Sequence, residues 1–374
     1  MDGAPEGGLT HRRAPTIYDV ARVAGVAPST VSRAFSRPSR VSATTAARIR
    51  AIATDLGYRV NPIARALPTG RTSMLAVIVS DVTNPFFFEI IRGAETAAAA
   101  AGYVLLLIDT HESSGDERAA IDRAIPMVDA IVLANSRMSD SAIRMVAKER
   151  PTVVLNRPLS DVPSVVSDNA RGTRLAVEHL AALGHHDVSY AGGPEASWAD
   201  GERWRSVREA THALDLRAHR IGPFPPTLAG GLLAARTFAT RPTTAVVVYN
   251  DLMAIGMMAG LARLGARIPA DVSVVGFDNI FGSSFCNPPL TTVAAPLNAL
   301  GTAAVHLVLG AAGTGGVGEA AMLPTRLVVR ESTGPRSRRR KPFAWAAAVP
   351  PGVPGEPRAR PGVPASRPVG QAEG

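Results

Sequence analysis

The stretch Thr16–Phe35, TIYDVARVAGVAPSTVSRAF, predicts two short helices on either side of one glycine. Thr16 can cap the first helix, and Asp19, three residues later, completes a T-x-x-D variant of the capping box. Gly25 can adopt the left-handed backbone conformation that other residues resist, and Pro28 suits the first turn of the second helix. Two helices joined in this way are typical of a helix-turn-helix.

The second helix has one apolar and one polar side. Val31 and Phe35 lie one turn apart and can pack inward, which leaves an outer side formed by Ser29, Thr30, Ser32 and Arg33. Hydroxyl groups and an arginine can contact phosphates and base edges in the major groove of DNA. An ordinary helical hairpin with a solvated polar face has the same pattern, so this motif alone leaves both interpretations open.

The residues that follow favour DNA binding. A third helix is predicted over Ser42–Gly57, with Ser42 as its N-cap and Gly57 at its end, and YRVNPIARAL comes next. Here the chain resembles the lactose-repressor/galactose-repressor family of bacterial transcription factors. The matching segments are TIYDVARVAGV, TVSR, RVSATT, GYRVNPIARAL and TGRT, in the family's order and spacing, and the resemblance covers residues 15–334.

The resemblance implies a set of DNA-binding positions. Those that match base-reading positions are Pro28, Ser29 and Arg33. Those that match positions holding phosphates, or helix ends beside them, are Thr16, Tyr18, Thr30, Ser32, Ser42, Thr45, Tyr58 and Asn61. Asn61–Leu67, which includes Ala64, matches a hinge helix that folds on DNA. Leu67 matches a leucine that opens a base step in the minor groove.

Two residues depart from the family pattern. Ala27 stands where serine is common, so a capping oxygen is absent. Pro68 follows Leu67 directly, and proline disfavours the helical conformation of the residue before it. The hinge helix is therefore expected to end at or before Leu67, which can alter the approach of this leucine to DNA.

Charge is distributed unevenly along the 374 residues. Residues 1–72 carry 11 arginines and 4 acids, a net charge of +7, whereas residues 73–334 carry 21 basic and 25 acidic residues, a net charge of −4. Residues 335–374 carry 8 basic and 2 acidic residues. This pattern fits a nucleic-acid-binding head on a nearly neutral body, followed by a basic tail.

The composition excludes several other classes of protein. Cys286 is the only cysteine, so an internal disulfide and a zinc site of several cysteines are impossible, which fits a reducing cytosol. The N-terminus does not resemble a secretory signal, and the apolar stretch Ala97–Ile108 is too short to span a membrane. We expect a protein without a membrane partner that acts in the cytoplasm, on the bacterial nucleoid.

Strands and helices alternate from Met74 onward, which predicts parallel sheets covered by helices. The expected strands are MLAVIV, YVLLLI, AIVL and TVVL, all read as buried, and later VSYAG, AVVVY and SVVGF. The expected helices are Pro85–Ala101, Asp116–Val128, Ser139–Glu149, Glu202–Leu214, Leu228–Ala239 and Asp251–Leu264. From these patterns alone, one or two α/β domains are possible.

The resemblance implies a more detailed fold than these patterns alone. It implies an all-α helix-turn-helix head on an α/β bilobed body like the periplasmic binding proteins, with two parallel-sheet subdomains. The lobes are expected to meet near Leu155–Asn169 and again near Asp278–Val293, and the strand near Arg326–Val329 closes the body. The expected divisions are a flexible leader (1–14), the head (15–60), hinge and linker (61–73), the body (74–334) and a disordered basic tail (335–374).

Bilobed bodies bind ligands in the cleft, at the carboxyl ends of parallel strands. The residues expected there are Asp81, Asn84, Phe86, Phe87, Trp198, Arg203, Phe224, Asn250 and Asp278. Arg203 matches the family arginine that grips effector hydroxyls or a carboxylate, and Asn250 and Asp278 can bind vicinal sugar hydroxyls. Capping of the next helix is the alternative for these last two, and Asp251 is expected to cap in any case.

Aromatic residues near the cleft have two possible roles. Phe86 and Phe87 match positions that can stack on a ring, although at least one aromatic of their run is expected in the core. Trp198 and Phe224 are equally compatible with core and cleft. No catalytic motif is present, and no cofactor or metal site is predicted.

We interpret the chain as a sequence-specific transcriptional regulator, most simply a repressor controlled by a small effector, with a sugar favoured. A homodimer would place two heads on one palindromic operator in double-stranded DNA. A transporter's solute-binding protein shares the expected body but needs a signal peptide and has no use for Thr16–Leu67. A sugar-acting enzyme is a third alternative, for which no motif argues.

Overall fold

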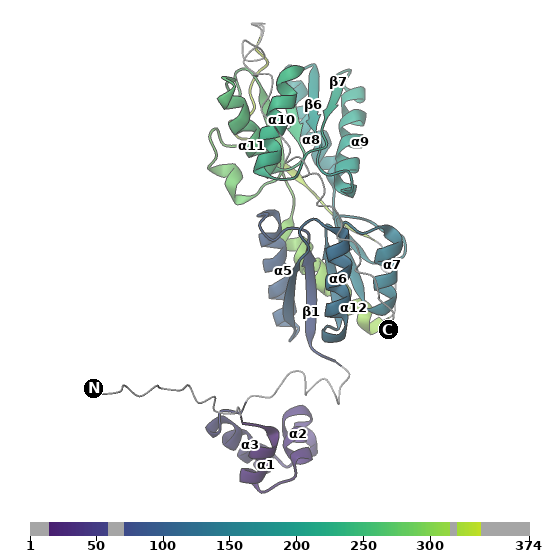
Figure 1. Ribbon diagram of the computed structural model, residues 1–374, viewed down its shortest axis with the longest axis vertical. Helices are drawn as coiled ribbons and strands as arrows, with labels where there is room; N and C mark the ends of the chain where they lie inside the picture. Colours follow the sequence, from purple (N-terminus) through teal and green to yellow (C-terminus); the bar gives the residue numbers. More distant parts are fainter. Residues whose placement is uncertain (1–14, 59–70, 315–319, 338–374) are drawn as a thin grey trace, which may run out of the picture.

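The computed structural model describes residues 15–58, 71–314 and 320–337. They form a small helical head and two α/β lobes, which contain the two sheets (Figure 1). The expected leader lies outside the described residues, as do the hinge residues Asn61, Ala64 and Leu67 and most of the basic tail. Of the described residues, no helix is both long and apolar enough to cross a membrane.

The head consists of three helices around one apolar core. They are α1 (Ile17–Ala24), α2 (Pro28–Ser36) and α3 (Ala43–Asp55), with a short 3₁₀ turn, η1 (Pro38–Arg40), between the last two. Each helix contributes a fully buried side chain to the core: Val20, Val31 and Ile49. The three helices expected from the sequence are therefore confirmed.

The helix ends of the head follow the predicted chemistry. The Asp19 carboxylate accepts hydrogen bonds from the backbone N–H of Thr16 (2.9 Å) and from its hydroxyl (2.7 Å). Gly25 has a φ of 61° and ends α1. At α2, Ala27 supplies no side-chain cap, whereas at α3 the Ser42 hydroxyl accepts a bond from the Thr45 N–H. The departure at residue 27 thus leaves the start of the second helix without a capping oxygen.

The first lobe is a parallel sheet between two pairs of helices. Its strand order is β11-β5-β4-β3-β1-β2. The strands are β1 (Met74–Val79), β2 (Val104–Asp109), β3 (Ala130–Ala134), β4 (Thr152–Leu155), β5 (Ser164–Ser167) and β11 (Ala321–Leu323). One face packs on α5 (Phe86–Ala100) and α12 (Leu297–Thr314). The other packs on α6 (Ser114–Ala124), η2 (Ile125–Met127) and α7 (Asp140–Glu149).

The second lobe repeats this design. Its strand order is β12-β10-β9-β8-β6-β7, and all described pairs are parallel except β10 with β12. The strands are β6 (Asp187–Ala191), β7 (Arg217–Ile221), β8 (Ala245–Val248), β9 (Ser273–Asp278), β10 (Thr291–Ala294) and β12 (Arg326–Val328). The helices are α8 (Asn169–Ala182) and α9 (Trp198–Ala213) on one face, and α10 (Leu228–Thr240) and α11 (Asp251–Arg263) on the other.

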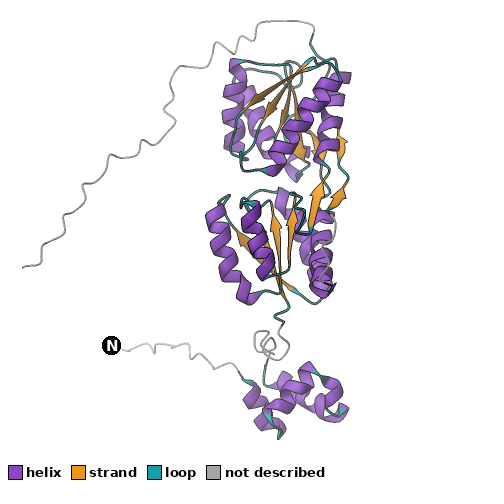
Figure 2. Cartoon of the chain, turned by 90° about the vertical axis from the view of Figure 1, so that its right-hand side faces the viewer, coloured by secondary structure: helices purple, strands orange, loops and turns teal. Residues whose placement is uncertain are grey.

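The chain passes between the lobes three times. It first leaves β5 for α8 near Ser167–Asn169, as expected. The second passage lies between β10 and α12, at 295–296, which is later than the expected Asp278–Val293, because β9 and β10 both belong to the second sheet. A third passage joins β11 to β12. Figure 2 shows the two sheets one above the other, with these connections on one side.

Several elements differ from the sequence expectation. The strand β2 is not buried, because it is the edge of its sheet and Val104 is 64% exposed. The helix α9 begins at Trp198 rather than Glu202, because the Ser197 hydroxyl accepts a hydrogen bond from the Asp200 N–H and caps it there. The helices α8 and α12 were not predicted. The second of these has no Asp, Glu, Lys or Arg, so no charged residue marks its exposed side.

Candidate functional sites

The outer face of α2 presents the predicted polar residues. Pro28, Ser29 and Arg33 are exposed, and Thr30 and Ser32 are half-buried. The opposite side is held in the core by Val31 and Ala34. Phe35 lies beside the core with its ring 6.1 Å from that of Tyr58. The helix therefore exposes a small hydroxyl-bearing surface with one arginine, a shape and chemistry suited to a DNA groove.

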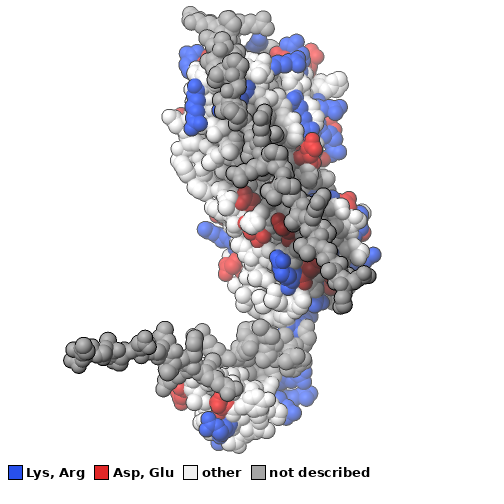
Figure 3. All heavy atoms as spheres, viewed as in Figure 1, with Lys and Arg blue, Asp and Glu red and all other residues white. Residues whose placement is uncertain are grey.

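Other predicted DNA-binding residues surround this face. Tyr18 is 70% exposed on α1. Thr16, Ser42 and Thr45 lie at helix starts, where their hydroxyls join the caps; the Ser42 hydroxyl also donates to that of Thr45 (2.8 Å). Tyr58 is half-buried, and burial raises the pKa of its hydroxyl. In Figure 3, Lys and Arg side chains gather on the head, while both charge signs are mixed over the lobes.

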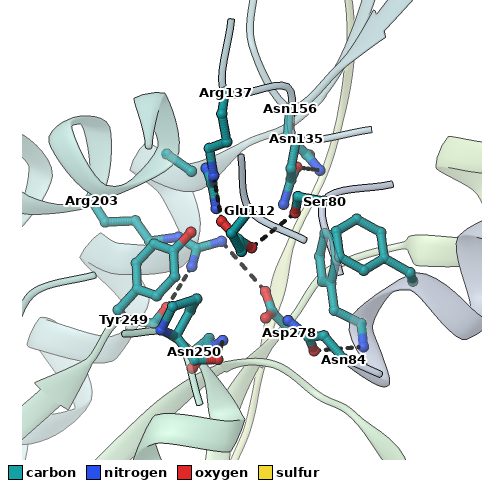
Figure 4. Close-up of a pocket in the computed structure, with 14 residues that line it drawn as sticks. Ser80, Asn84, Glu112, Asn135, Arg137, Asn156, Arg203, Tyr249, Asn250 and Asp278 are labelled. Atoms are coloured by element: carbon teal, nitrogen blue, oxygen red, sulfur yellow. Dashed lines mark hydrogen bonds and ion pairs between the residues drawn. The ribbon is translucent and has the colours of Figure 1, made fainter. Parts of the chain in front are cut away.

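A cavity lies between the two lobes (Figure 4). The first lobe lines it with Ser80, Asn84, Phe86, Phe87, Glu112, Asn135, Arg137 and Asn156, and the second with Ala199, Arg203, Pro226, Tyr249, Asn250 and Asp278. Its free volume is about 20 Å³, which is enough for a single water molecule. A larger ligand therefore requires the lobes to part or the lining side chains to move.

Arg203 is the centre of the second-lobe wall. Its guanidinium donates hydrogen bonds to the Asn169 side-chain oxygen (3.0 Å) and to the Tyr249 carbonyl, and it pairs with the Asp278 carboxylate at 3.4 Å. It also lies 3.5 Å from the centroid of the Phe277 ring. The planar, five-donor guanidinium suits this arrangement, and the contacts fix its orientation in the cavity.

Two buried carboxylates follow neighbouring strands of this lobe. Burial raises the pKa of Asp278 to about 8, and Arg203 opposes that rise. Burial also raises the pKa of Asp251 to about 6, although Ser283, Thr292 and backbone N–H groups donate hydrogen bonds to it. Asp278 has a φ of 110°, which is rare for a residue with a side chain. Strain and shifted pKa values of this kind often mark functional positions.

The first-lobe wall contains a second charged pair. The Glu112 carboxylate accepts hydrogen bonds from Nε of Arg137 (2.5 Å) and from the Ser80 hydroxyl (2.9 Å). Beside this pair, the Asn156 amide donates to the Asn135 side-chain oxygen (2.8 Å). Next to α5, the Asn84 side-chain oxygen accepts a bond from the N–H of Phe86, the first residue of that helix (3.1 Å). Both walls therefore offer hydrogen-bonding groups to a ligand.

Six of the nine predicted cleft residues line the cavity: Asn84, Phe86, Phe87, Arg203, Asn250 and Asp278. Phe86 and Phe87 are also core residues, with their rings edge to face at 5.0 Å. Asn250 lines the cavity and caps α11, because its side-chain oxygen accepts a bond from the Met253 N–H. Asp251 is therefore not the cap, and its carboxylate instead holds the segment around Ile280 and Ser283.

The other three predicted cleft residues lie elsewhere. The Asp81 carboxylate faces its own loop and accepts bonds from the Thr83 N–H and hydroxyl. Trp198 lines a separate open groove, together with Arg157 and Glu195. Phe224 packs beside the core of the second lobe. None of these three side chains lines the cavity in this structure, and their predicted contact with an effector stays a prediction.

Several lining residues were missed from the sequence. They are Ser80, Glu112, Asn135, Arg137, Asn156, Ala199, Pro226 and Tyr249. Most of them lie within three residues after the end of a strand, namely β1, β2, β3, β4 or β8. The rule that ligands bind at the carboxyl ends of parallel strands, applied to every strand, would have found these positions. Within the described ranges, no group of three or more His, Cys, Asp or Glu residues is arranged to hold a metal ion.

Comparison with known proteins identifies the head and the body of the chain. The profile for "Bacterial regulatory proteins, lacI family" matches residues 16–61, and that for a "Periplasmic binding protein-like domain" matches residues 177–333. The HTH-type transcriptional repressor CytR of Escherichia coli K12 is 33% identical over 329 residues, covering 86% of this chain and 96% of the relative. The chain belongs to the lacI family of bacterial regulatory proteins. The regulator DegA of Bacillus subtilis 168 is 30% identical, covering 86% of this chain and 98% of its own length.

Solved structures of the lacI family share this fold. The lac repressor dimer bound to operator and the anti-inducer ONPF matches with a TM-score of 0.78 at 27% identity, covering 86% of this chain and 100% of that one. A CelR–cellobiose complex matches with a TM-score of 0.64 at 29% identity, covering 85% and 99% of the two chains. The expected helix-turn-helix head and bilobed body are confirmed, and the chain is a DNA-binding transcriptional regulator rather than an enzyme.

Proposed function

We propose that this lacI-family regulator is a repressor that binds a palindromic operator as a homodimer and releases it when a small effector enters the interlobe cavity. The observation that carries the proposal is the cavity itself, because Arg203 and Asp278 from one lobe face Glu112 and Arg137 from the other. A ligand that bridges the two walls would bind one lobe arrangement more tightly than the other, and only such a difference can shift the equilibrium.

We favour a sugar as the effector. Carboxylates, amides and guanidinium groups can all exchange hydrogen bonds with hydroxyls, and Phe86 and Phe87 add apolar surface to the cavity wall. A lacI-family regulator of Enterococcus faecium, 29% identical, was solved with bound ribose, and CelR was solved with cellobiose. Effector binding would shift the first lobes of the dimer against each other and displace the hinge segment 61–67.

We propose that the two chains of the dimer meet at a cluster of three exposed phenylalanines. Phe88 of α5 is 43% exposed. Phe281 begins the 3₁₀ turn η3 (Phe281–Ser284) and is 61% exposed, and Phe285, which follows this turn, is 70% exposed. The rings of Phe88 and Phe281 are stacked at 6.2 Å, and those of Phe281 and Phe285 lie 5.6 Å apart. Aromatic groups exposed together in this way favour a protein partner, and the related lac repressor is a dimer.

DNA recognition is tested by replacing Arg33. An operator is first selected from random duplexes with the full chain, and its affinity is then compared with that of unrelated DNA in a fluorescence anisotropy assay. Arg33→Ala should lower the preference for the operator by roughly tenfold or more, since one good base contact contributes about 1–3 kcal/mol of discrimination. Arg217→Ala, an exposed arginine of β7, serves as the matched control and should keep the preference.

The same assay over a range of salt concentrations checks the contribution of phosphate contacts. For two or more such contacts, affinity should fall about tenfold for each fourfold rise in salt. An unchanged operator preference in Arg33→Ala, or binding that does not respond to salt, would contradict the proposed recognition by the head.

A further inference from the structure

A preformed ion pair covers the first-lobe side of the cavity. Glu112 follows β2 and Arg137 follows β3, and these two strands flank β1, which ends beside Ser80. The two loops therefore converge over the end of β1, where the Glu112 carboxylate accepts bonds from Arg137 and Ser80 together. The Arg137 side chain is only 6% exposed and that of Glu112 is 26% exposed. Water therefore screens this pair weakly.

The backbone holds the pair in place. Glu112 has a φ of 60°, a left-handed conformation that is uncommon for a residue with a side chain, and its N–H donates to the Ser80 carbonyl at 2.6 Å. On the other side, the Arg137 N–H donates to the buried carboxylate of Glu117 at 2.9 Å. Both charged groups are thus positioned by main-chain contacts, and the pair is a built part of the cavity wall.

The arginine of the opposite wall is also occupied. Arg203 donates to Asn169, to the Tyr249 carbonyl and to Asp278, so its guanidinium is already engaged by protein acceptors. Neither arginine of the cavity therefore faces a ligand without an acidic partner. A phosphate or carboxylate placed here would meet the Glu112 carboxylate at short range in a nearly dry site, where the repulsion between the two negative charges is weakly screened.

A hydroxyl-bearing, uncharged ligand meets no such penalty. Its hydroxyls can donate to the Glu112 carboxylate and accept from the remaining N–H groups of Arg137 without changing the charge of the site. We propose that Glu112, held by Arg137 and Ser80, makes the cavity selective for neutral hydroxyl-bearing effectors and rejects their phosphorylated forms. This inference rests on the proposed function and adds the charge class of the effector.

The test compares matched compounds on the full chain. Ribose, glucose and the common ribonucleosides are paired with their monophosphates, and binding is followed by thermal shift and calorimetry. The wild-type protein should bind at least one neutral compound at least about tenfold more tightly than its phosphate. Glu112→Gln keeps the size of the side chain and removes its charge, so it should weaken that preference about tenfold or reverse it.

Glu149→Gln, an exposed carboxylate on α7, is the matched control and should keep the preference of the wild type. A wild-type preference for the phosphates, binding of no neutral compound, or an unchanged preference in Glu112→Gln would each overturn the inference. Operator binding by each variant is measured separately. Loss of operator binding with ligand preference intact would count against the proposed function and leave the charge selectivity standing.

Discussion

At the residue scale, the cavity depends on groups whose properties the fold has changed. Asp278 ends β9 with a positive φ and faces Arg203, while Asp251, at the start of α11, is completely buried and accepts three hydrogen bonds. Neither carboxylate is solvated, so both hold their protons more tightly than in the unfolded chain. Buried carboxylates of this kind connect stability to pH.

The contribution of these two carboxylates to the free energy of unfolding should therefore fall as pH rises from about 4 to about 8. Burial raises the pKa of Asp251 to about 6 and that of Asp278 to about 8, from an ordinary value of 3.8. In this range the folded protein binds more protons than the unfolded chain, and stability is lost as they dissociate. In Asp251→Asn, the slope between about pH 4 and 6 should become shallower in urea denaturation at several pH values.

Asp271→Asn is the control for this measurement. Arg267 hydrogen-bonds the Asp271 carboxylate and holds its pKa below the ordinary value, so this substitution should remove a stabilising contribution above about pH 4 and leave the slope between pH 4 and 6 unchanged. A slope in Asp251→Asn that equals the wild-type slope between pH 4 and 6 would show that Asp251 is ionised throughout in the folded protein.

Some of the residues that line the cavity were predicted from the sequence alone. Arg203, Asn250, Asp278 and Asn84 were found because they stand where the family carries such residues. Asp81 and Trp198 do not line the cavity, because their direction depends on a local turn and on the starting point of a helix, neither of which the residue type reveals. Glu112 and Arg137 were missed because only the order of the strands brings the loops after β2 and β3 together.

At the element scale, α5 and α12 form the most closely packed helix pair of the first lobe. A methyl group at Gly301 would lie 2.0 Å from the Ile90 carbonyl oxygen and 2.8 Å from the Ala94 nitrogen, and one at Gly93 would lie 2.1 Å from the Asn298 carbonyl oxygen. Glycines therefore allow the two backbones to approach closely.

Gly301→Ala should therefore destabilise the protein. The added methyl group meets backbone atoms that cannot move independently, and overpacking of this kind costs about 1–3 kcal/mol or more in free energy of unfolding. Gly310 lies on the same helix with open space around it, so Gly310→Ala should stabilise the helix by up to about 1 kcal/mol. Urea denaturation measures the stability of both variants, and equal effects would contradict the close approach of α5 and α12 at Gly301.

The head was predicted more completely than the lobes, for a physical reason. Its helix boundaries are set by local signals, such as the Thr16–Asp19 cap, Gly25 and Ser42, all of which act within a few residues. The lobes depend on contacts between distant segments. The edge position of β2, for example, follows from the order of the strands and not from its apolar sequence.

At the scale of the whole molecule, the proposed function requires the association of two chains. Phe281→Asp places a charge in the centre of the Phe88–Phe281–Phe285 cluster, where a partner surface would have to desolvate it. We expect the variant to sediment as a monomer at micromolar concentrations at which the wild type is a dimer. Its operator affinity should also fall, because two linked heads bind one site more tightly than separate heads.

Met145→Asp is the control for dimer formation. Met145 is 53% exposed on α7, away from the phenylalanine cluster in sequence and on another helix, so this variant should remain a dimer. A Phe281→Asp protein that sediments as the wild type does would show that the phenylalanine cluster is not the interface.

The central claim is that the interlobe cavity controls the binding of DNA by the head. It is tested most directly by adding a compound that binds the cavity to the protein–operator complex, with wild-type protein and Arg203→Ala compared in fluorescence anisotropy. The wild type should release its operator, whereas Arg203→Ala should bind the same operator and stay bound, which also shows that the variant is folded. Release of both proteins at the same concentration, or of neither, would contradict the account.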